Sequence, residues 1–401
     1  MNARLATLVV VLSLLWMLNA AAEPKAMSPK TYAAIQAAQA LMDANLPGQA
    51  VEALQGQAAS LAEQPYDLAM VLQIQAHAEL ARDDPNTAAE LLERCLNLNT
   101  LADKERLALL YTLAQVSMLA QRYDSAARHM SRWLAETPTP KAEAHALLGS
   151  AHLQAKRYAQ AIEPLRRAIE LSDSPLESWY QALLGAYFET KRLDRCTALL
   201  RDMIRRFPQR DGYWRQLGQV ELARRRYREA LVAMDLAYLR GALNAEQDLL
   251  TLAQLRLQQG TPYPAAELLE KEIGRGRIHA SASRWELTAN AWYQAKETTK
   301  SMEALRRASK IKGATGSLRI RLAQLYLEAR QWDTAQASLD ELLSKTTLDD
   351  DDRGQAWLLL GIARHGAQSP QEARAAFTQA AKLASSRDQA RQWLGYLDNT
   401  D

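Results

Sequence analysis

The sequence has little phenylalanine, cysteine, glycine or proline, and almost no excess of charge of either sign. Its 401 residues include 3 Phe, 2 Cys, 16 Gly and 13 Pro, and the formal net charge is +3. With 48% hydrophobic and 24% charged residues, so few helix breakers argue against long disordered stretches. A net charge this small does not supply the concentrated basic face that nucleic-acid binding needs. We therefore expect a folded protein that does not bind nucleic acid.

Long apolar runs are also missing after residue 18. Leu5–Leu18 is an apolar run of about 14 residues that follows a short basic start and precedes the small residues Asn19–Ala22. This order predicts a secretory signal peptide at residues 1–22, because a membrane span needs about 20 apolar residues. No Cys stands directly after the run, so a lipoprotein anchor has no thiol to use. We expect a periplasmic protein of a Gram-negative bacterium, without an integral membrane span once the signal is cleaved.

What the chain does contain is an abundance of helix-forming residues arranged in an internal repeat. A small residue recurs at spacings of about 34 to 38 residues, and a large apolar residue stands four positions after each. The small residues are Ala50, Ala88, Ala126, Ala161, Cys196, Ala230, Ala265, Ser301, Ala335 and Ala373. The large residues are Leu54, Leu92, Met130, Leu165, Leu200, Met234, Leu269, Leu305, Leu339 and Phe377. In most units another small residue lies twelve positions earlier, although Leu184 breaks this rule in the fifth unit.

A pair of amphipathic helices explains this pattern. Where two helices cross closely, a bulky side chain would push the backbones apart, so Ala or Gly is favoured. One pair cannot bury its apolar face alone, but stacked pairs build a continuous core. The units Ala144–Leu171 and Tyr213–Ala237, with their Leu-Gly, Tyr and Ala spacing, resemble tetratricopeptide repeats. The resemblance covers roughly residues 31–383 and implies an all-α, right-handed α-solenoid.

The repeat frame sets the expected organisation of the chain. About ten hairpins occupy residues 23–384, and residues 385–401 form a capping helix and tail. The repeats leave no room for a separate catalytic domain, so we do not expect an enzyme. We also expect no cofactor.

Histidines and cysteines offer no clear reactive site. His145 and His152 share a helix face and could pair on a metal, but they occupy repeat slots where packing explains them as well. Cys95 and Cys196 also occupy packing slots, about three units apart, which is too far for a disulfide. We expect separate buried thiols and no metal site.

The remaining candidates are on the surface of the predicted solenoid. One slot on the first helix of each hairpin faces the inside of the superhelix, and amide side chains there could bind the backbone of an extended partner. Tetratricopeptide repeats favour a polar residue at this slot in general, so both interpretations remain open. The candidates in this polar row are Gln115, Gln219, Gln254, Asn290 and Gln324.

A stretch rich in arginine is the second surface candidate. It could dock an acidic segment or a lipid headgroup, or it could be a solvated helix face that aids solubility. The residues of this basic patch are Arg205, Arg206, Arg210, Arg215, Arg224, Arg225 and Arg226.

The mature chain also resembles a narrower family, the periplasmic tetratricopeptide-repeat component of TonB energy-transduction systems. The likeness is clearest at Tyr66–Leu80, Tyr123–Leu134, Tyr213–Leu217 and Ala390–Leu397. It implies a protein-binding scaffold that engages TonB or its inner-membrane motor proteins and assists the import of iron complexes through outer-membrane receptors. The alternative is a periplasmic adaptor for polysaccharide export or envelope assembly.

Overall fold

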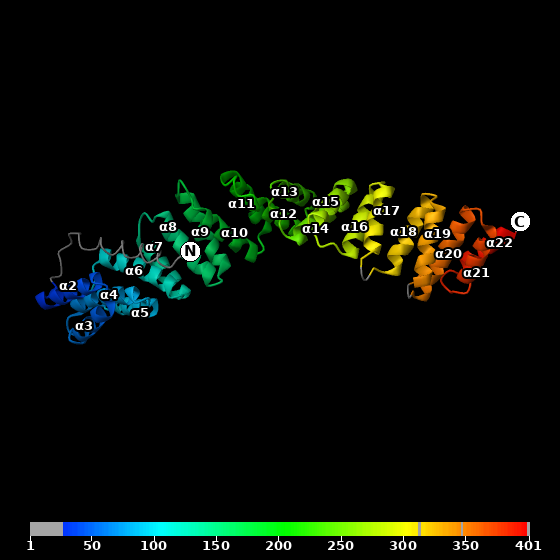
Figure 1. Ribbon diagram of the computed structural model, residues 1–401. Coiled ribbons are helices and arrows are strands. Elements are labelled where there is room, and N and C mark those ends of the chain that lie inside the picture. The colour runs from blue at the N-terminus through cyan, green and yellow to red at the C-terminus, as the bar shows by residue number, and fades with distance from the viewer. Residues whose placement is uncertain (1–26, 312–313, 346–347, 399–401) are drawn as a thin grey trace. The chain divides into compact units, whose positions relative to one another are not determined.

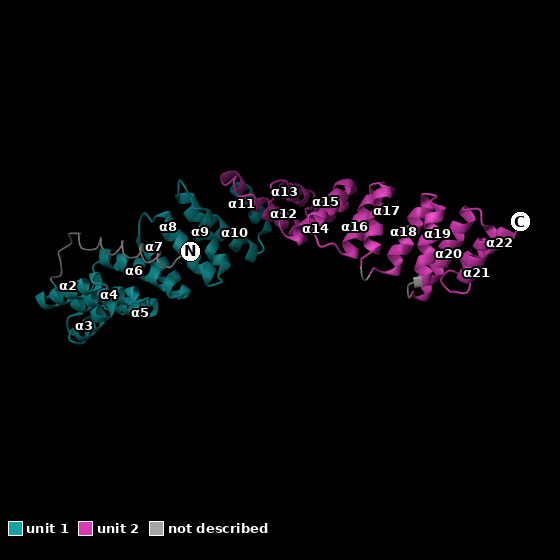
Figure 2. Cartoon of the chain, in the orientation of Figure 1, with its two compact units in different colours: residues 1–203 teal, residues 204–401 magenta. Residues whose placement is uncertain are grey.

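The computed structural model describes residues 27–311, 314–345 and 348–398. The predicted signal peptide lies outside the described residues. Within the described residues every element is a helix, and none is a strand. The chain divides into two compact units at residues 203 and 204, coloured separately in Figure 2.

Unit 1 contains the first nine labelled helices of Figure 1 and most of the tenth. The nine are α2 (Pro29–Asp43), α3 (Pro47–Ala59), α4 (Pro65–Ala81), α5 (Pro85–Asn97), α6 (Asp103–Leu119), α7 (Tyr123–Glu136), α8 (Ala142–Gln154), α9 (Tyr158–Leu171) and α10 (Glu177–Glu189). From α3 to α10, each helix packs against the one before it. The boundary between the units falls within α11 (Leu193–Arg206).

Unit 2 continues the same alternation. Its helices are α12 (Gly212–Ala223), α13 (Tyr227–Leu239), α14 (Glu246–Gln258), α15 (Pro262–Gly274), α16 (Ala282–Gln294), α17 (Thr298–Ser309), α18 (Gly316–Glu328), α19 (Trp332–Lys345), α20 (Asp350–Gly366), α21 (Pro370–Ala380) and α22 (Arg387–Asp398). Each packs against the next, and α22 also contacts α20. The predicted fold class, an all-helical solenoid of about ten hairpins that ends in a capping helix, is confirmed.

The even-numbered helices α2–α20 are the first helices of the hairpins and the odd-numbered helices are the second. Local signals set their ends. Ser28 and Asp84 cap α2 and α5 by accepting the backbone N–H of Thr31 and Thr87, and several helices begin with Pro. Every turn between the two helices of a hairpin holds one residue with φ between 54° and 75°. These residues are Asn45, Asp83, Gln121, Lys156, Lys191, Arg225, Gly260, Lys296, Arg330 and Gln368.

The recurring small and large residues form the core, as the repeat predicted. The small residues of the second helices are all at most 1% exposed and the large ones at most 2% exposed. At Gly149 in α8, an added Cβ would lie 2.5 Å from Leu165 Cγ and 3.2 Å from Leu165 N. Similar crowding by Met234 surrounds Gly218. Close crossing of the two helices therefore explains the glycine at this slot.

We expect the substitution Gly149→Ala to destabilise the α8–α9 hairpin by about 1–2 kcal/mol, because overpacking outweighs the gain in helix propensity. Gly185 in α10 is the matched control, since nothing lies within 4 Å of its added Cβ. Gly185→Ala should stabilise its helix by about 0.5–1 kcal/mol. Hydrogen exchange of the amides in α8 and α10 measures both effects. Equal signs for the two substitutions would contradict the close-crossing interpretation.

None of the helices in the described ranges combines the length and the apolar character that a bilayer-spanning segment needs.

Candidate binding surfaces

The structure places every residue of the polar row on a first helix. Gln115 lies on α6, Gln219 on α12, Gln254 on α14, Asn290 on α16 and Gln324 on α18. Gln219 and Gln254 are exposed and the other three are half-buried. Gln219 Nε2 donates to Asp248 Oδ1 at 3.3 Å, so this amide is partly engaged inside unit 2. The row as a binding surface stays a prediction, and Gln115 alone of the five belongs to unit 1.

The structure divides the arginines of the basic patch into two groups. Arg205 and Arg206 end α11 and Arg210 lies in the following loop, so these three precede α12. The residues that follow α12 are Arg224, Arg225 and Arg226. Because α12 has 12 residues, its two ends are about 18 Å apart. Arg215 lies on α12 itself, between these two groups.

Two arginines of this set make ion pairs within unit 2. Arg224 is half-buried, and its Nη1 lies 3.0 Å from Glu221 Oε2. On α12 itself, Arg215 Nη1 lies 3.5 Å from Asp248 Oδ2. These side chains support the local packing as well as carrying charge. The set as a docking site stays a prediction.

A pocket beside Gln115 was not predicted from the sequence. Its volume is about 540 Å³, and α6, α7 and the start of α8 form its walls. The residues that line it include Tyr111, Thr112, Trp133, Thr137, Lys141 and Glu143. Tyr111 and Thr112 lie four and three residues before Gln115, so all three share one face of α6. We call this cavity the aromatic pocket.

The aromatic pocket combines an aromatic wall with polar groups. The rings of Tyr111 and Trp133 meet edge to face, with centroids 5.1 Å apart. Burial raises the pKa of Tyr111, and the negative charge of Glu143 raises it further, so the phenol stays a hydrogen-bond donor. Thr137 Oγ1 and Gln115 Oε1 are buried without a hydrogen-bond partner among the described residues. Buried polar atoms are normally paired, so these two oxygens are exceptions. Thr137 lines the pocket, and Gln115 lies one turn of α6 beyond Tyr111.

One residue of the sequence signals this pocket, because it differs from its counterparts in the other hairpins. Trp133 stands seven positions after the recurring Ala126, in a slot where smaller residues recur. Other hairpins have Ala168, Ala237, Ala308 and Ala380 there. An indole in an alanine slot needs extra room between neighbouring hairpins, and it contributes a large apolar surface.

The possible metal ligands and the cysteines were the remaining candidates for a reactive site. The described residues contain no group of three or more His, Cys, Asp or Glu side chains that could hold a metal ion. Cys95 and Cys196 are free and buried, as expected. Burial raises the pKa of Cys95 to about 12 and that of Cys196 to about 11, so both stay protonated near neutral pH and are poor nucleophiles.

Comparison with known proteins supports the repeat assignment. A family model described as Tetratricopeptide repeat matches residues 111–175 and 320–388, so the chain contains tetratricopeptide repeats. No curated protein matches the chain.

Solved structures of repeat proteins resemble parts of the chain. The crystal structure of MamA is 20% identical, with a TM-score of 0.34, over 43% of this chain and 92% of that one. A tetratricopeptide repeat protein from Parabacteroides merdae is 13% identical, with a TM-score of 0.36, over 75% of this chain and 100% of that one.

Proposed function

We propose that this chain, which carries tetratricopeptide repeats, is a scaffold that binds a protein partner, and that the aromatic pocket receives a side chain of an extended partner segment. The observation that carries the proposal is a half-buried aromatic wall beside two oxygens that have no hydrogen-bond partner among the described residues. These are Thr137 Oγ1, from a residue that lines the pocket, and Gln115 Oε1, from the next turn of α6. The wall provides apolar contact, and the oxygens can accept backbone N–H groups of the partner.

Rigidity favours binding at this pocket. Tyr111 and Trp133 are fixed on α6 and α7, which pack against each other, so little side-chain entropy is lost when a partner docks. Lys141 and Glu143 add one charge of each sign to the lining. A segment with an apolar or aromatic residue next to polar ones fits this arrangement best.

We expect Trp133→Ala to weaken partner retention about thirtyfold, since truncating an aromatic hot spot costs about 2 kcal/mol or more. Trp179→Ala is the matched control, because Trp179 is also a half-buried tryptophan of unit 1 and does not line the aromatic pocket. Tagged full-length protein is cross-linked in its host cells, purified, and its bound partners are quantified by mass spectrometry. Equal retention by both variants would reject the pocket as the docking site.

We further propose that the scaffold acts in the periplasm as an accessory component of a TonB-dependent transport system. The support is the apolar N-terminal run of the sequence and the local likeness to the TonB-associated repeat family. Cell fractionation and N-terminal sequencing of the mature protein test the location. Recovery of TonB or its motor proteins in the cross-linked complexes supports the transport role, whereas recovery of polysaccharide-export proteins supports the alternative adaptor role.

A further inference from the structure

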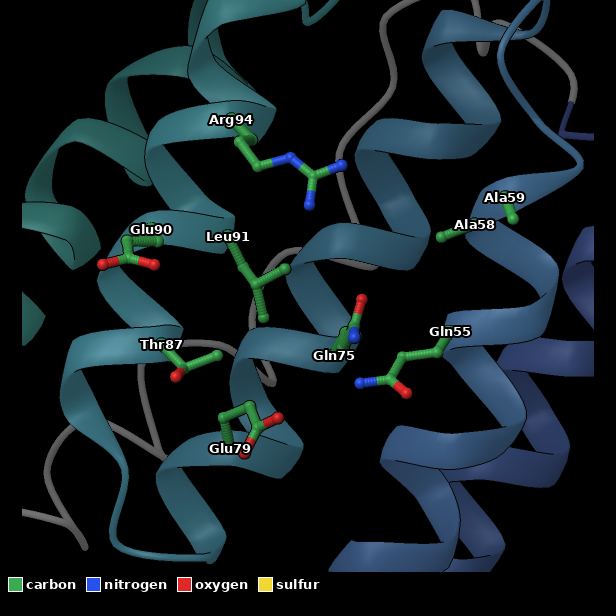
Figure 3. Close-up of a pocket in the computed structure, with 9 residues that line it drawn as sticks. All are labelled: Gln55, Ala58, Ala59, Gln75, Glu79, Thr87, Glu90, Leu91 and Arg94. Atoms are coloured by element: carbon green, nitrogen blue, oxygen red, sulfur yellow. The ribbon is translucent and has the colours of Figure 1, made fainter.

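A second cavity lies in unit 1, in the groove between α3 and α5 with α4 as its floor (Figure 3). Its volume is about 410 Å³. The polar residues that line this α3–α5 groove are Gln55, Gln75, Glu79, Thr87, Glu90 and Arg94. In Figure 3, Arg94 and Glu79 lie toward opposite ends of the group, and Gln55 and Gln75 lie between them.

The groove is separate from the polar row of the first helices. His77 is the residue of α4 that occupies the row slot, and Gln75 and Glu79 lie two residues to either side of it. Two residues rotate an α-helix by about 200°, so Gln75 and Glu79 point to the side of α4 opposite His77. A ligand in the groove would not compete with one in the aromatic pocket.

Gln75 is the first sign that the groove binds a ligand. It stands immediately before Ala76, the recurring small residue of α4, and most other hairpins have leucine at this position. The leucines of this slot are all half-way along a first helix and buried: Leu113, Leu148, Leu183, Leu217, Leu252, Leu322 and Leu360. Gln75 is only 5% exposed and lines the cavity, and no hydrogen bond joins its side chain to another described residue. The amide therefore reaches the open space of the groove, where a ligand can bond to it. A polar side chain in a slot that otherwise holds leucine departs from the repeat, and such departures concentrate at functional sites.

The charges of the groove leave one cation uncompensated. Glu79 Oε2 lies 2.9 Å from Arg82 Nη1, and Glu90 Oε1 lies 2.6 Å from Arg122 Nη2. Arg94 makes neither a hydrogen bond nor an ion pair with the described residues. The guanidinium is therefore the group of the lining that is available to an anion.

In the corresponding groove of unit 2, between α15 and α17, the charged groups are paired with one another. Trp292 replaces Glu79 there, and its indole N–H donates to Glu270 Oε2 at 3.2 Å while Lys300 Nζ lies 4.3 Å from the ring centroid. Arg307 occupies the slot of Arg94, and its Nη2 lies 2.7 Å from Glu303 Oε1 and its Nη1 3.8 Å from Glu270 Oε1. Gln55 of unit 1 stands where Glu270 stands in unit 2, so a neutral amide replaces one of the two carboxylates that pair with Arg307. The other, Glu303, corresponds to Glu90, which in unit 1 pairs with Arg122 instead.

We propose that the α3–α5 groove binds the carboxylate group of a ligand that also carries a hydrogen-bond donor. Arg94 engages the carboxylate in a fork geometry, and the amides of Gln55 and Gln75 contribute further hydrogen bonds. The donor group of the ligand faces the carboxylate of Glu79. A free amino acid and an acidic side chain of a peptide share this chemistry.

Isothermal titration calorimetry of the purified full chain tests the proposal with three probes. These are L-glutamate, an acetylated and amidated peptide with one glutamate among alanines, and the same peptide with glutamine instead. We expect saturable binding of L-glutamate, of the glutamate peptide, or of both, and the comparison identifies the source of the carboxylate. The glutamine peptide should not bind.

Two variants and one control test whether the carboxylate probes bind in the α3–α5 groove. Arg94→Gln and Gln75→Leu should each weaken the affinity about tenfold or more. Gln75→Leu restores the residue common at this slot, so it should not lower the stability of unit 1. Arg167→Gln, which removes an exposed arginine from the same slot on α9, should leave the affinity unchanged. Lack of binding by every carboxylate probe up to about 10 mM, or equal affinities for Arg94→Gln and Arg167→Gln, would overturn the proposal without affecting the aromatic pocket.

Discussion

Replacing Glu272 with alanine is expected to lower the unfolding free energy of unit 2 by about 3–5 kcal/mol, because it leaves partly buried donors without their acceptor. Glu272 on α15 is completely buried. Tyr238 Oη donates to its Oε1 at 2.7 Å, and Arg277 Nε donates to its Oε2 at 2.5 Å. Arg275 Nη1 lies 3.6 Å from Oε1. The side chains of Tyr238 on α13 and of Arg275 and Arg277, which follow α15, thus all interact with one carboxylate.

Chemical denaturation followed by circular dichroism, with hydrogen exchange to assign the loss to unit 2, measures this effect. Glu267→Ala is the matched control on the same helix, since Glu267 is exposed and its removal should change the unfolding free energy by no more than about 0.5 kcal/mol. If the two substitutions had the same effect, the buried network would not be a significant source of stability.

The same network makes unit 2 sensitive to acid. Burial alone would raise the pKa of Glu272, but the hydrogen bonds from Arg277 and Tyr238 outweigh it and hold the pKa below the usual glutamate value. A carboxyl whose pKa is depressed by folding stabilises the protein fully above its unfolded pKa, and this contribution is lost as the pH falls through the folded value. The unfolding free energy of the native chain should therefore decline below about pH 4.5, and the decline should be shallower in Glu272→Gln. Parallel pH profiles for the two proteins would contradict this assignment.

The repeat frame was predictable because it is periodic. The positions equivalent to Ala161 and Leu165 recur along the chain, so each repeat supports the assignment of the others. Where two helices cross in the core, only a few residue types fit. The turns inside the hairpins behave differently. Their left-handed residues include Lys156, Lys191 and Arg330. Asn45, Asp83 and Gly260 are of the residue types that such a backbone favours, but the other seven are not, so composition gave little signal.

The sites were harder to predict because they depend on departures from the repeat. Polar slots such as that of Gln115 could be read from one helix, but the aromatic pocket requires α6, α7 and α8 together. Trp133 and Glu272 both occupy the slot where alanine recurs, yet one opens a pocket and the other forms a buried ion network. Which outcome follows depends on neighbours outside the slot, such as Tyr111 on α6 and Arg277 in the loop after α15. A single sequence does not specify those neighbours.

Leu165 provides the strictest test of the interpretation that closely crossing helices select small residues. It is completely buried in α9, against Gly149 of α8. Truncation to alanine should cost about 2–5 kcal/mol in the unfolding free energy of unit 1, since it removes buried apolar contacts and leaves a cavity. The backbone nitrogen of residue 165 would still lie 3.2 Å from a Cβ at position 149.

A double-mutant cycle separates the two terms. In the Leu165→Ala background the atoms that crowd Gly149 most, Leu165 Cγ at 2.5 Å and Cδ2 at 2.8 Å, are gone. Gly149→Ala should then stabilise the hairpin by about 0.5–1 kcal/mol through helix propensity, reversing its sign relative to the native background. Denaturation and hydrogen exchange of α8 and α9 measure all four proteins. If Gly149→Ala were equally destabilising in both backgrounds, the backbone of α8 itself would require the glycine. The interpretation that the facing side chain of Leu165 selects a small residue would then be wrong.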